Sequence, residues 1–334
     1  MPTTPESRIK IQVNNLTKRF GDLTVLDGIN FNIKEGELLA IVGPTGCGKT
    51  TFLNTLSKLM PATEGEILID GEEANPKKHN ISYVFQEPTC LPWRTVRENV
   101  AYGMEVKGVG KEEREARATQ IMDLVGLSSC ADLYPNQVSA SMMQRIAVSR
   151  AFAVNPDLLL MDEPLSHLDG KARQAMRTEI KRLIHKIKCT TVYVTHDQLE
   201  AMSLADKIAV INFGVLQQYG TPAEVYDDPV NEFVASFIGD PPMNILETTT
   251  VKIDNDFFFT FKDSDLKIAV PKRYYSVVSD GFRCKMGVRP MDVLVGGADS
   301  QGTPEKITTF ENLGDERRIG ISVGESLLML ITAD

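Results

Sequence analysis

Long hydrophobic runs, paired cysteines and an excess of basic residues are all missing from this chain of 334 residues. No apolar run approaches the roughly 20 residues that a helix needs to cross a bilayer. The five cysteines are odd in number and form no C-x-x-C pair, so the sequence indicates neither a disulfide framework nor a zinc site. We therefore expect a reducing compartment, and any link to a membrane must go through a partner protein.

Basic charge is scarce because 36 Lys and Arg stand against 45 Asp and Glu, which leaves a formal net charge of -9. Such an acidic chain is a poor match for a surface that binds nucleic acid as its main function. The first residues, Met1-Pro-Thr-Thr-Pro-Glu-Ser7, lack the charged-then-apolar form of a signal peptide. What remains is an ordinary globular composition, with 42% hydrophobic residues, at a length that suits two domains.

The most informative stretch is Gly43-Pro-Thr-Gly-Cys-Gly-Lys-Thr50, which matches the phosphate-loop pattern G-x-x-x-x-G-K-[ST]. It follows the apolar run 38–42, which predicts a buried strand, and precedes 51–60, which has helical spacing. Glycines let backbone N–H groups face phosphate oxygens, and a helix N-terminus adds positive potential. We expect Lys49 to reach the β- and γ-phosphates and the Thr50 hydroxyl to ligate Mg²⁺. The predicted nucleotide-binding residues are Gly43, Pro44, Thr45, Gly46, Cys47, Gly48, Lys49, Thr50 and Thr51.

Polar residues stand at the ends of three further apolar runs. Asp162 and Glu163 end the run Leu158–Met161, and in a P-loop protein the first acid can hold Mg²⁺ while the second orients or deprotonates a water. The alternative is a pair of solvated loop acids. Gln86 follows the run 81–85, where it either senses Mg²⁺ or water or is a solvated loop residue. His196 follows the run 190–195. It either faces a ligand, since ligands collect at the carboxyl ends of parallel strands, or is a structural histidine.

The segment 9–33 alternates as strands do, with a turn at Phe20-Gly-Asp-Leu23. Phe20 either stacks on a purine ring or packs in the core. Residues 61–71 predict a short hairpin built around Gly65 and Gly71.

Helical spacing dominates residues 95–153, which predicts a helical insertion within an α/β domain. The break at Gly239-Asp-Pro-Pro-Met-Asn244 marks the expected domain boundary. Beyond it, short alternating runs predict a small β-barrel or sandwich, in which Phe257-Phe-Phe259 is core. These runs are 247–253, 257–261, 266–270, 283–288, 306–313 and 327–331.

Taken together, these motifs resemble the ATP-binding subunit of an ABC transporter, over about residues 9–245. The resemblance implies an α/β fold with a P-loop NTPase (RecA-like) core in residues 1–240 and a helical subdomain at about 89–153. It also implies a C-terminal all-β, OB-like domain of the TOBE type in residues 241–334. The implied activity is ATP hydrolysis with ATP and Mg²⁺, coupled to solute translocation. Two such subunits pair head to tail in this family.

The resemblance assigns roles residue by residue. Phe20 falls at the adenine-stacking position, and Ser166–Asp169 at the D-loop, which includes Asp169. The implied catalytic residues are Glu163, His196 and Gln86, and the implied magnesium ligands are Thr50, Gln86 and Asp162.

The signature loop departs from the family pattern Leu-Ser-Gly-Gly-Gln. This chain has Val138-Ser-Ala-Ser141, so Ser139 is retained while Ala140 and Ser141 replace both glycines. Side chains there should crowd the approach to the partner's nucleotide. Since the other motifs are intact, we expect an asymmetric heterodimer with one impaired site and a different second ATPase subunit. The alternative is a symmetric homodimer.

The C-terminal part resembles importers of sugars, polyols and glycerol phosphate, through the junction 239–244 and the segment Gly287-Val-Arg-Pro-Met-Asp292. The chain ends at Asp334, earlier than the family usually does. Leu91-Pro-Trp-Arg-Thr-Val96 is also common in anion and sulfonate importers, which leaves the solute open.

By this resemblance we expect a peripheral protein at the cytoplasmic face of the plasma (inner) membrane. Its partners would be two transmembrane permease subunits and, through them, an extracytoplasmic solute-binding protein. The rival functions are a soluble non-transport ABC protein, which the acidic charge disfavours, and a binding-only subunit, which Glu163 and His196 disfavour.

Overall fold

The computed structural model describes residues 8–76, 78–294, 296, 306–314 and 316–332. The first seven residues, where we find no signal-peptide pattern, and the chain end at Asp334 lie outside this range. Two compact units make up the chain, one up to Asp228 and one from Pro229 onward. No helix in the described part of the chain is long and apolar enough to span a bilayer.

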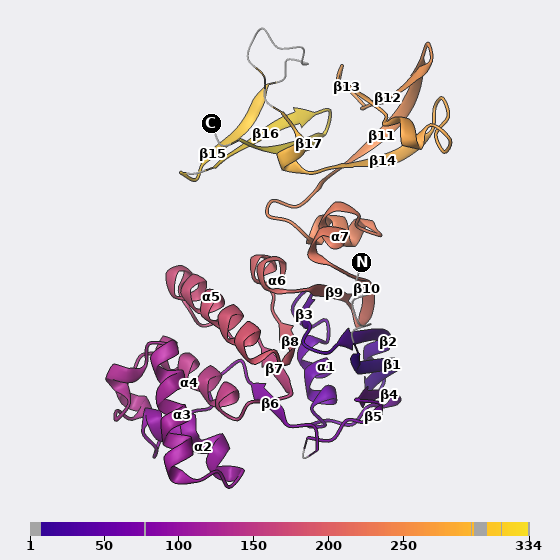
Figure 1. The fold of residues 1–334 in the computed structure, drawn as a ribbon. Helices are drawn as coiled ribbons and strands as arrows, with labels where there is room; N and C mark the ends of the chain where they lie inside the picture. The colour runs from indigo at the N-terminus through magenta and orange to yellow at the C-terminus, as the bar shows by residue number, and fades with distance from the viewer. Residues whose placement is uncertain (1–7, 77, 295, 297–305, 315, 333–334) are drawn as a thin grey trace, which may run out of the picture. The chain divides into compact units, whose positions relative to one another are not determined.

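A six-stranded sheet forms the centre of the first unit, in the order β10-β9-β3-β8-β7-β6 (Figure 1). All neighbouring strands run parallel except β10, which pairs antiparallel with β9. The strands predicted before the P-loop and before Gln86, Asp162 and His196 are confirmed as β3 Leu38–Val42, β6 Ile81–Val84, β7 Leu158–Asp162 and β8 Thr190–Val194. Strands β9 Lys207–Asn212 and β10 Val215–Gly220 complete the sheet. The carboxyl ends of these parallel strands share one edge of the sheet, so the predicted polar residues lie along it.

A second, antiparallel sheet has the order β2-β1-β4-β5. Its strands are β1 Ile9–Phe20, β2 Leu23–Lys34, β4 Glu64–Ile69 and β5 Glu72–Glu73. The predicted turn after Phe20 is confirmed, and so is a hairpin turn at Gly71. The expectation for Gly65 is wrong, because this residue lies inside β4. A Cβ there would stand 2.2 Å from the Asn15 carbonyl oxygen, so Gly65 serves the close approach of β4 to β1.

Helix α1 (Lys49–Leu56) packs between the two sheets of the first unit (Figure 1). Phe52, Leu53 and Leu56 are fully buried in the core that both sheets share. The helix ends before the predicted residue 60, because Ser57 caps it and Lys58 adopts a left-handed φ of 59°.

The opposite face of the central sheet packs against a second core, to which several of the remaining helices contribute. Leu159 and Met161 of β7 belong to this second core, whereas Leu158 and Leu160 belong to the first, so β7 is buried on both faces as predicted. The helical insertion between β6 and β7 is confirmed and gathers at one side of the unit (Figure 1). The insertion contains α2 Val96–Val106, α3 Lys111–Leu124 and α4 Ala140–Ala153, with short 3₁₀ turns at Ser128–Cys130 and Pro135–Gln137. The helices that follow β7, β8 and β10 are α5 Gly170–Ile187, α6 Gln198–Leu204 and α7 Pro222–Asp227.

The second unit begins with α8 (Glu232–Phe237), which the sequence-based boundary at 239–244 leaves in the first domain. After Asn244 the unit continues as strands, and short strands are what the sequence predicts there. Two hydrogen bonds tie this helical segment to the strands of its unit: Lys285 Nζ donates to Glu232 Oε2 at 2.8 Å, and the Arg289 guanidinium donates to the Ile238 carbonyl. The strands are β11 Asn244–Ile253, β12 Asp256–Thr260, β13 Lys267–Ala269, β14 Arg283–Val288, β15 Ile307–Asn312, β16 Arg317–Val323 and β17 Ser326–Thr332, with 3₁₀ turns at Lys272–Tyr274 and Pro290–Asp292.

Two antiparallel sheets, β13-β12-β11-β14 and β15-β16-β17, share one core in this unit. Leu246 and Phe259 from the first sheet pack in the same cluster as Val323 and Leu328 from the second. The expected fold class, an α/β ATPase-type core followed by an all-β part, is therefore confirmed. Strand β16 is absent from the sequence-based expectation. Of the run predicted as core, Phe259 is buried and Phe257 packs partly buried against the same cluster, whereas Phe258 is only half-buried and lies outside it.

Candidate functional site

The P-loop is packed too tightly for side chains at two of its glycines. A Cβ on Gly43 would stand 2.1 Å from the Ile211 carbonyl oxygen of β9. A Cβ on Gly48, whose φ is 106°, would stand 2.7 Å from the Val25 carbonyl oxygen of β2. The loop thus lies between β2 and β9, with its backbone free of side chains where phosphate oxygens must approach. Sequence reasoning missed Val25, because its position is set by the packing of β2 against the loop.

Lys49 and Thr50 begin α1 directly after this loop. Lys49 is only 5% exposed, and its Nζ donates to the carbonyl oxygens of Gly43 and Pro44 at 2.9 and 3.0 Å. No side chain caps the N-terminus of α1, so its first N–H groups remain available to an anion. An ammonium, a helix N-terminus and a glycine-lined loop at one point form a site for a polyphosphate.

Asp162 ends β7 beside Thr50, whose Oγ1 donates to Asp162 Oδ1 at 3.1 Å. Burial, followed by the charge of Glu163, raises the pKa of Asp162, while the Thr50 bond and Lys49 oppose this. One hydroxyl and one carboxylate suit Mg²⁺, which keeps several waters and takes its other ligands from phosphate. The described residues hold no cluster of three or more His, Cys, Asp and Glu that would bind a metal by itself.

Tyr83 is a neighbour of Asp162 that sequence reasoning missed. Its hydroxyl donates to Asn54 Oδ1 of α1 at 3.1 Å, and burial together with the Asp162 charge raises the pKa of Tyr83 far above its usual range. The order of strands explains this contact. Strand β6 pairs with β7, so Tyr83 lies near Asp162 at the end of β7.

Glu163 and His196 follow neighbouring strands and meet at the sheet edge. His196 Nδ1 lies 2.9 Å from Glu163 Oε2. The Glu163 backbone has a left-handed φ of 43°, which is unusual for a non-glycine residue and stores about 1–3 kcal/mol of strain. Its N–H donates to the Val194 carbonyl and its carbonyl accepts from Ser166 Oγ, both at 2.9 Å. The neighbouring strand and the following turn therefore hold the strained Glu163 backbone in place.

Phe20 and Gln86 are both exposed. The Phe20 ring is 47% exposed, with the Lys18 ammonium 5.0 Å from its centroid, so it does not pack in the core. The ring is free to stack on a base, and that role stays a prediction. Gln86 lies two residues after the end of β6 and is exposed, and its role toward Mg²⁺ or water stays a prediction.

The signature residues begin α4. Ser139 is the N-cap, and its Oγ accepts from the Met142 N–H at 3.3 Å. The Ser141 hydroxyl lies 2.9 Å from the same Oγ. These contacts are local to the start of α4, and the role of Ser139, Ala140 and Ser141 toward a partner's nucleotide stays a prediction. Asp169 caps α5, where its Oδ1 accepts from the Ala172 N–H at 2.9 Å.

Glu200 is a buried carboxylate beside the site that sequence reasoning also missed. It is 3% exposed on α6, and its Oε2 accepts from Tyr193 OH and Thr195 Oγ1, each at 2.8 Å. Burial is the main cause that raises the pKa of Glu200. In the sequence nothing separates this glutamate from an exposed one on a short helix.

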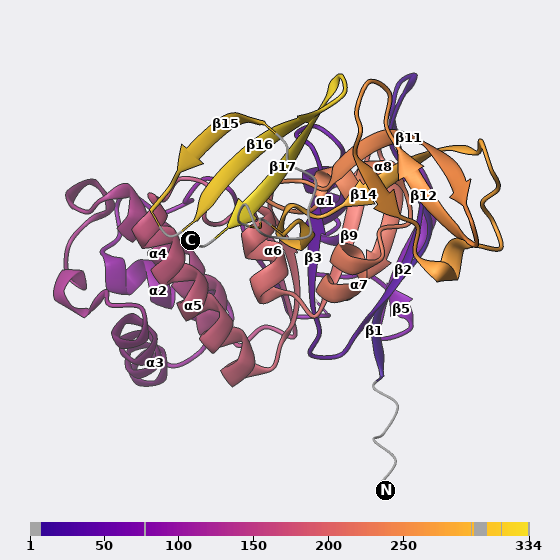
Figure 2. The same cartoon turned by 90° about the horizontal axis from the view of Figure 1, so that it is seen from above.

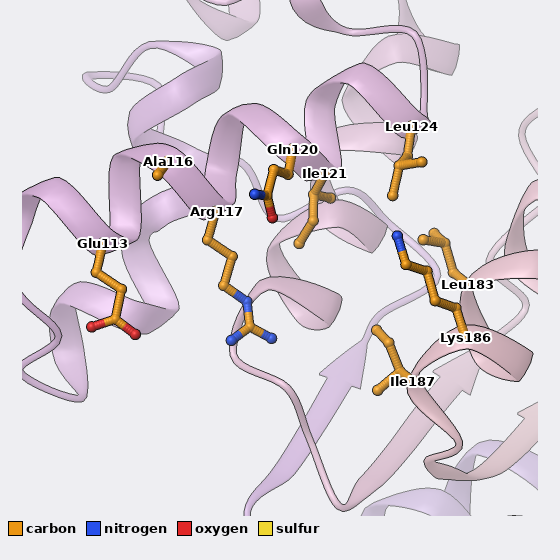
Figure 3. A pocket seen from close by; sticks show the side chains of 9 residues that line it. All are labelled: Glu113, Ala116, Arg117, Gln120, Ile121, Leu124, Leu183, Lys186 and Ile187. Atoms are coloured by element: carbon orange, nitrogen blue, oxygen red, sulfur yellow. The ribbon is translucent and has the colours of Figure 1, made fainter.

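A pocket of about 390 Å³ lies apart from all these motifs, between α3 and the end of α5 (Figure 3). Its lining combines Glu113, Arg117 and Gln120 of α3 with Leu183, Lys186 and Ile187 of α5. None of the predicted site residues lines this pocket. The candidate nucleotide site is therefore a different place, at the carboxyl edge of the central sheet.

Comparison with known proteins agrees with this geometry. Residues 26–166 match the family model described as "ABC transporter". The sn-glycerol-3-phosphate import ATP-binding protein UgpC of Bordetella avium (strain 197N) is 40% identical over 324 residues, which cover 96% of this chain and 88% of that protein. The trehalose/maltose import ATP-binding protein MalK of Thermococcus litoralis is 37% identical over 332 residues, covering 94% and 88%.

A solved structure is also similar to this chain. It is a dimeric post-hydrolysis state of the ATP-binding cassette MJ0796 bound to ADP and Pi, with a TM-score of 0.58 and 33% identity. The similarity covers 64% of this chain and 98% of MJ0796.

Proposed function

The chain belongs to the ABC transporter family of ATP-binding proteins, and from that premise we propose that it powers the import of a small solute through partner permease subunits. It is an ATPase that works with ATP and Mg²⁺. The observation that carries the proposal is the meeting of Glu163 and His196 at the sheet edge that also holds Lys49, Thr50 and Asp162.

We propose a sugar, a polyol such as glycerol, or glycerol phosphate as the solute. The support is that relatives named for sn-glycerol-3-phosphate and for trehalose/maltose import align with more than nine tenths of this chain. The protein would act at the cytoplasmic face of the plasma membrane, with two permease subunits and an extracytoplasmic solute-binding protein.

Each site residue has a role in the proposed reaction. The P-loop amides and Lys49 would hold the nucleotide phosphates, and Thr50, Asp162 and Gln86 would hold Mg²⁺, which would supply charge neutralisation there. Phe20 would stack on the adenine. The Glu163 carboxylate orients or deprotonates the attacking water. An ionised carboxylate only accepts hydrogen bonds, so His196 Nδ1 carries the proton of their contact and keeps Glu163 in place.

We further propose an asymmetric pair of ATPase subunits, in which a different chain supplies a regular signature loop. Ser139 of this chain would face the partner's nucleotide, but the Ser141 hydroxyl lies 2.9 Å from Ser139 Oγ and competes for it. Ala140 adds a methyl group where the family pattern has a glycine. The site that this chain's Ser139 caps would then be impaired, whereas the site with this chain's Glu163 would work. The alternative is a symmetric homodimer.

The test of the solute class uses tagged chain purified from its native membranes with the subunits that accompany it. The complex should contain two permease subunits, and one of maltose, glycerol or glycerol 3-phosphate, with the solute-binding protein, should stimulate its ATPase activity. Stimulation by a sulfonate and by none of these solutes would show that the solute class is wrong.

The test of asymmetry is the double variant Ala140→Gly with Ser141→Gly. ATPase activity should rise several-fold in the variant complex if these side chains impair a site. Unchanged activity, in a preparation that contains only this ATPase chain, would favour the symmetric homodimer.

A further inference from the structure

Arg173 links two loops that the proposed reaction needs. It lies on the first turn of α5, and its Nη2 donates to the Leu168 carbonyl of the predicted D-loop at 3.2 Å. Its Nη1 donates to Asp197 Oδ2 at 3.3 Å. Asp197 directly follows His196, so one guanidinium spans the turn after β7 and the loop after β8. Figure 2 shows α5 and α6, the helices that these loops begin, as neighbours.

The residues on both sides of His196 are held by side chains. Before it, Thr195 Oγ1 donates to Glu200 Oε2 and accepts the Asp197 N–H at 2.9 Å. After it, Asp197 caps α6, since its Oδ1 accepts the N–H groups of Leu199 and Glu200 at 2.9 and 3.2 Å. The position of the His196 ring, which is itself about half exposed, therefore depends on the anchoring of Asp197.

We propose that Arg173 is a positioning residue that couples the D-loop turn to the loop of His196. The inference rests on the proposed function, in which His196 holds Glu163 and the D-loop lies against a second ATPase subunit. A displacement of Leu168 by that subunit would pull on Asp197 through the guanidinium and alter the contact between His196 and Glu163. Through Arg173, the pairing of two subunits would therefore change the position of the Glu163 carboxylate.

An arginine suits this task better than a lysine. The two acceptors belong to different loops, and a planar guanidinium offers separate N–H groups in a fixed fork to each. A lysine ammonium is a single point on a flexible stem, so it retains the charge beside Asp197 without holding both loops at a fixed distance. A positive charge at this position is therefore not enough to hold Leu168 and Asp197 together.

The experiment compares Arg173→Lys and Arg173→Gln with the wild type in the assembled complex. Both variants should lower kcat about ten-fold, because a small misplacement of a catalytic group is costly. Binding of a fluorescent ATP analogue, KM for ATP and the thermal midpoint should remain unchanged. Arg177→Gln is the matched control, since Arg177 lies one turn later on α5 and its Nη2 donates to Gln174 Oε1 of the same helix at 3.3 Å. It should keep the wild-type kcat.

Asp197→Asn provides a second route to the same link, because asparagine keeps the helix cap and loses the charge. Its effect should not add to that of Arg173→Gln, since both remove one interaction. Wild-type kcat in Arg173→Lys, or additive effects of the two variants, would overturn the proposal. Glu163→Gln and His196→Ala are measured in parallel. If Glu163→Gln and His196→Ala both retain full activity, the proposed function is wrong. If these two variants lose activity while the Arg173 variants keep it, only the proposed role of Arg173 is wrong.

Discussion

His196 Nδ1 lies 2.9 Å from Glu163 Oε2, although 33 residues separate them in the sequence. The contact exists because β7 and β8, which end just before these residues, are neighbours in the central sheet. The same pairing gives Glu163 its backbone bond to Val194. A carboxylate that is held by a neighbouring strand and a histidine is preorganised for its task on a water molecule.

The first prediction concerns this pair. Glu163→Gln should lower kcat for ATP hydrolysis by about 10²–10⁴-fold, because the amide cannot accept a proton from water. Binding of ATP should persist, since Lys49 and the P-loop are untouched. Single-turnover hydrolysis and equilibrium binding of labelled ATP measure the two quantities separately.

His196→Ala should also lower kcat, and the double variant should be little worse than Glu163→Gln alone, because the histidine acts through the carboxylate. Strictly additive losses would contradict this account and give His196 an independent role.

The second prediction concerns Lys49. Lys49→Ala should weaken ATP binding by at least about 2 kcal/mol, since it removes a nearly buried ammonium that bonds the P-loop carbonyls and lies beside the expected phosphates. Calorimetric titration with ATP and Mg²⁺ measures the loss. The control is Lys58→Ala, whose ammonium pairs with Glu73 at the surface beyond the end of α1. Equal affinities of the two variants would contradict the role of Lys49.

The third prediction is a pH dependence of stability that comes from Glu200. Burial raises its pKa in the folded state, so the folded protein holds the proton more tightly than the unfolded chain. The resulting stabilisation is fully present below the unfolded pKa of about 4.3 and is lost as the pH rises through the folded pKa.

Glu200→Gln keeps an oxygen that accepts from Tyr193 and Thr195 but does not titrate. The free energy of unfolding of this variant, relative to the wild type, should therefore increase as the pH rises from about 4 toward neutrality. Urea denaturation at several pH values measures the difference, and a pH-independent difference would count against a raised pKa.

The fourth prediction separates two roles of glycine in the hairpin of β4 and β5. Gly65 and Gly71 have similar φ values, 76° and 80°. A Cβ at Gly65 would lie 2.2 Å from a backbone oxygen, whereas a Cβ at Gly71 meets nothing within 4 Å. Gly71→Ala should cost only the left-handed strain of about 1–2 kcal/mol. Gly65→Ala should cost more, since the strands must separate. Equal losses in chemical denaturation would contradict the close approach of β4 to β1.

Much of the fold follows from local patterns in the sequence. The apolar runs that form β3, β7 and β8 were predictable as buried strands, because a short apolar segment between turn residues is typical of a strand that is buried on both faces. The P-loop pattern predicted a strand, a tight loop and a helix, since glycines and a lysine at that spacing suit one geometry. The end of α1 was missed because a left-handed Lys58 leaves no clear signal in the sequence.

By itself the sequence determined which chemical groups stand at strand ends, because that information is carried by neighbouring residues. Only the tertiary structure decided which of these groups meet. The contact of His196 with Glu163, the burial of Glu200 and the span of Arg173 between two loops all depend on the order of strands in the sheet. Strand order arises from the packing of segments far apart in the chain, and no local pattern of residues encodes it.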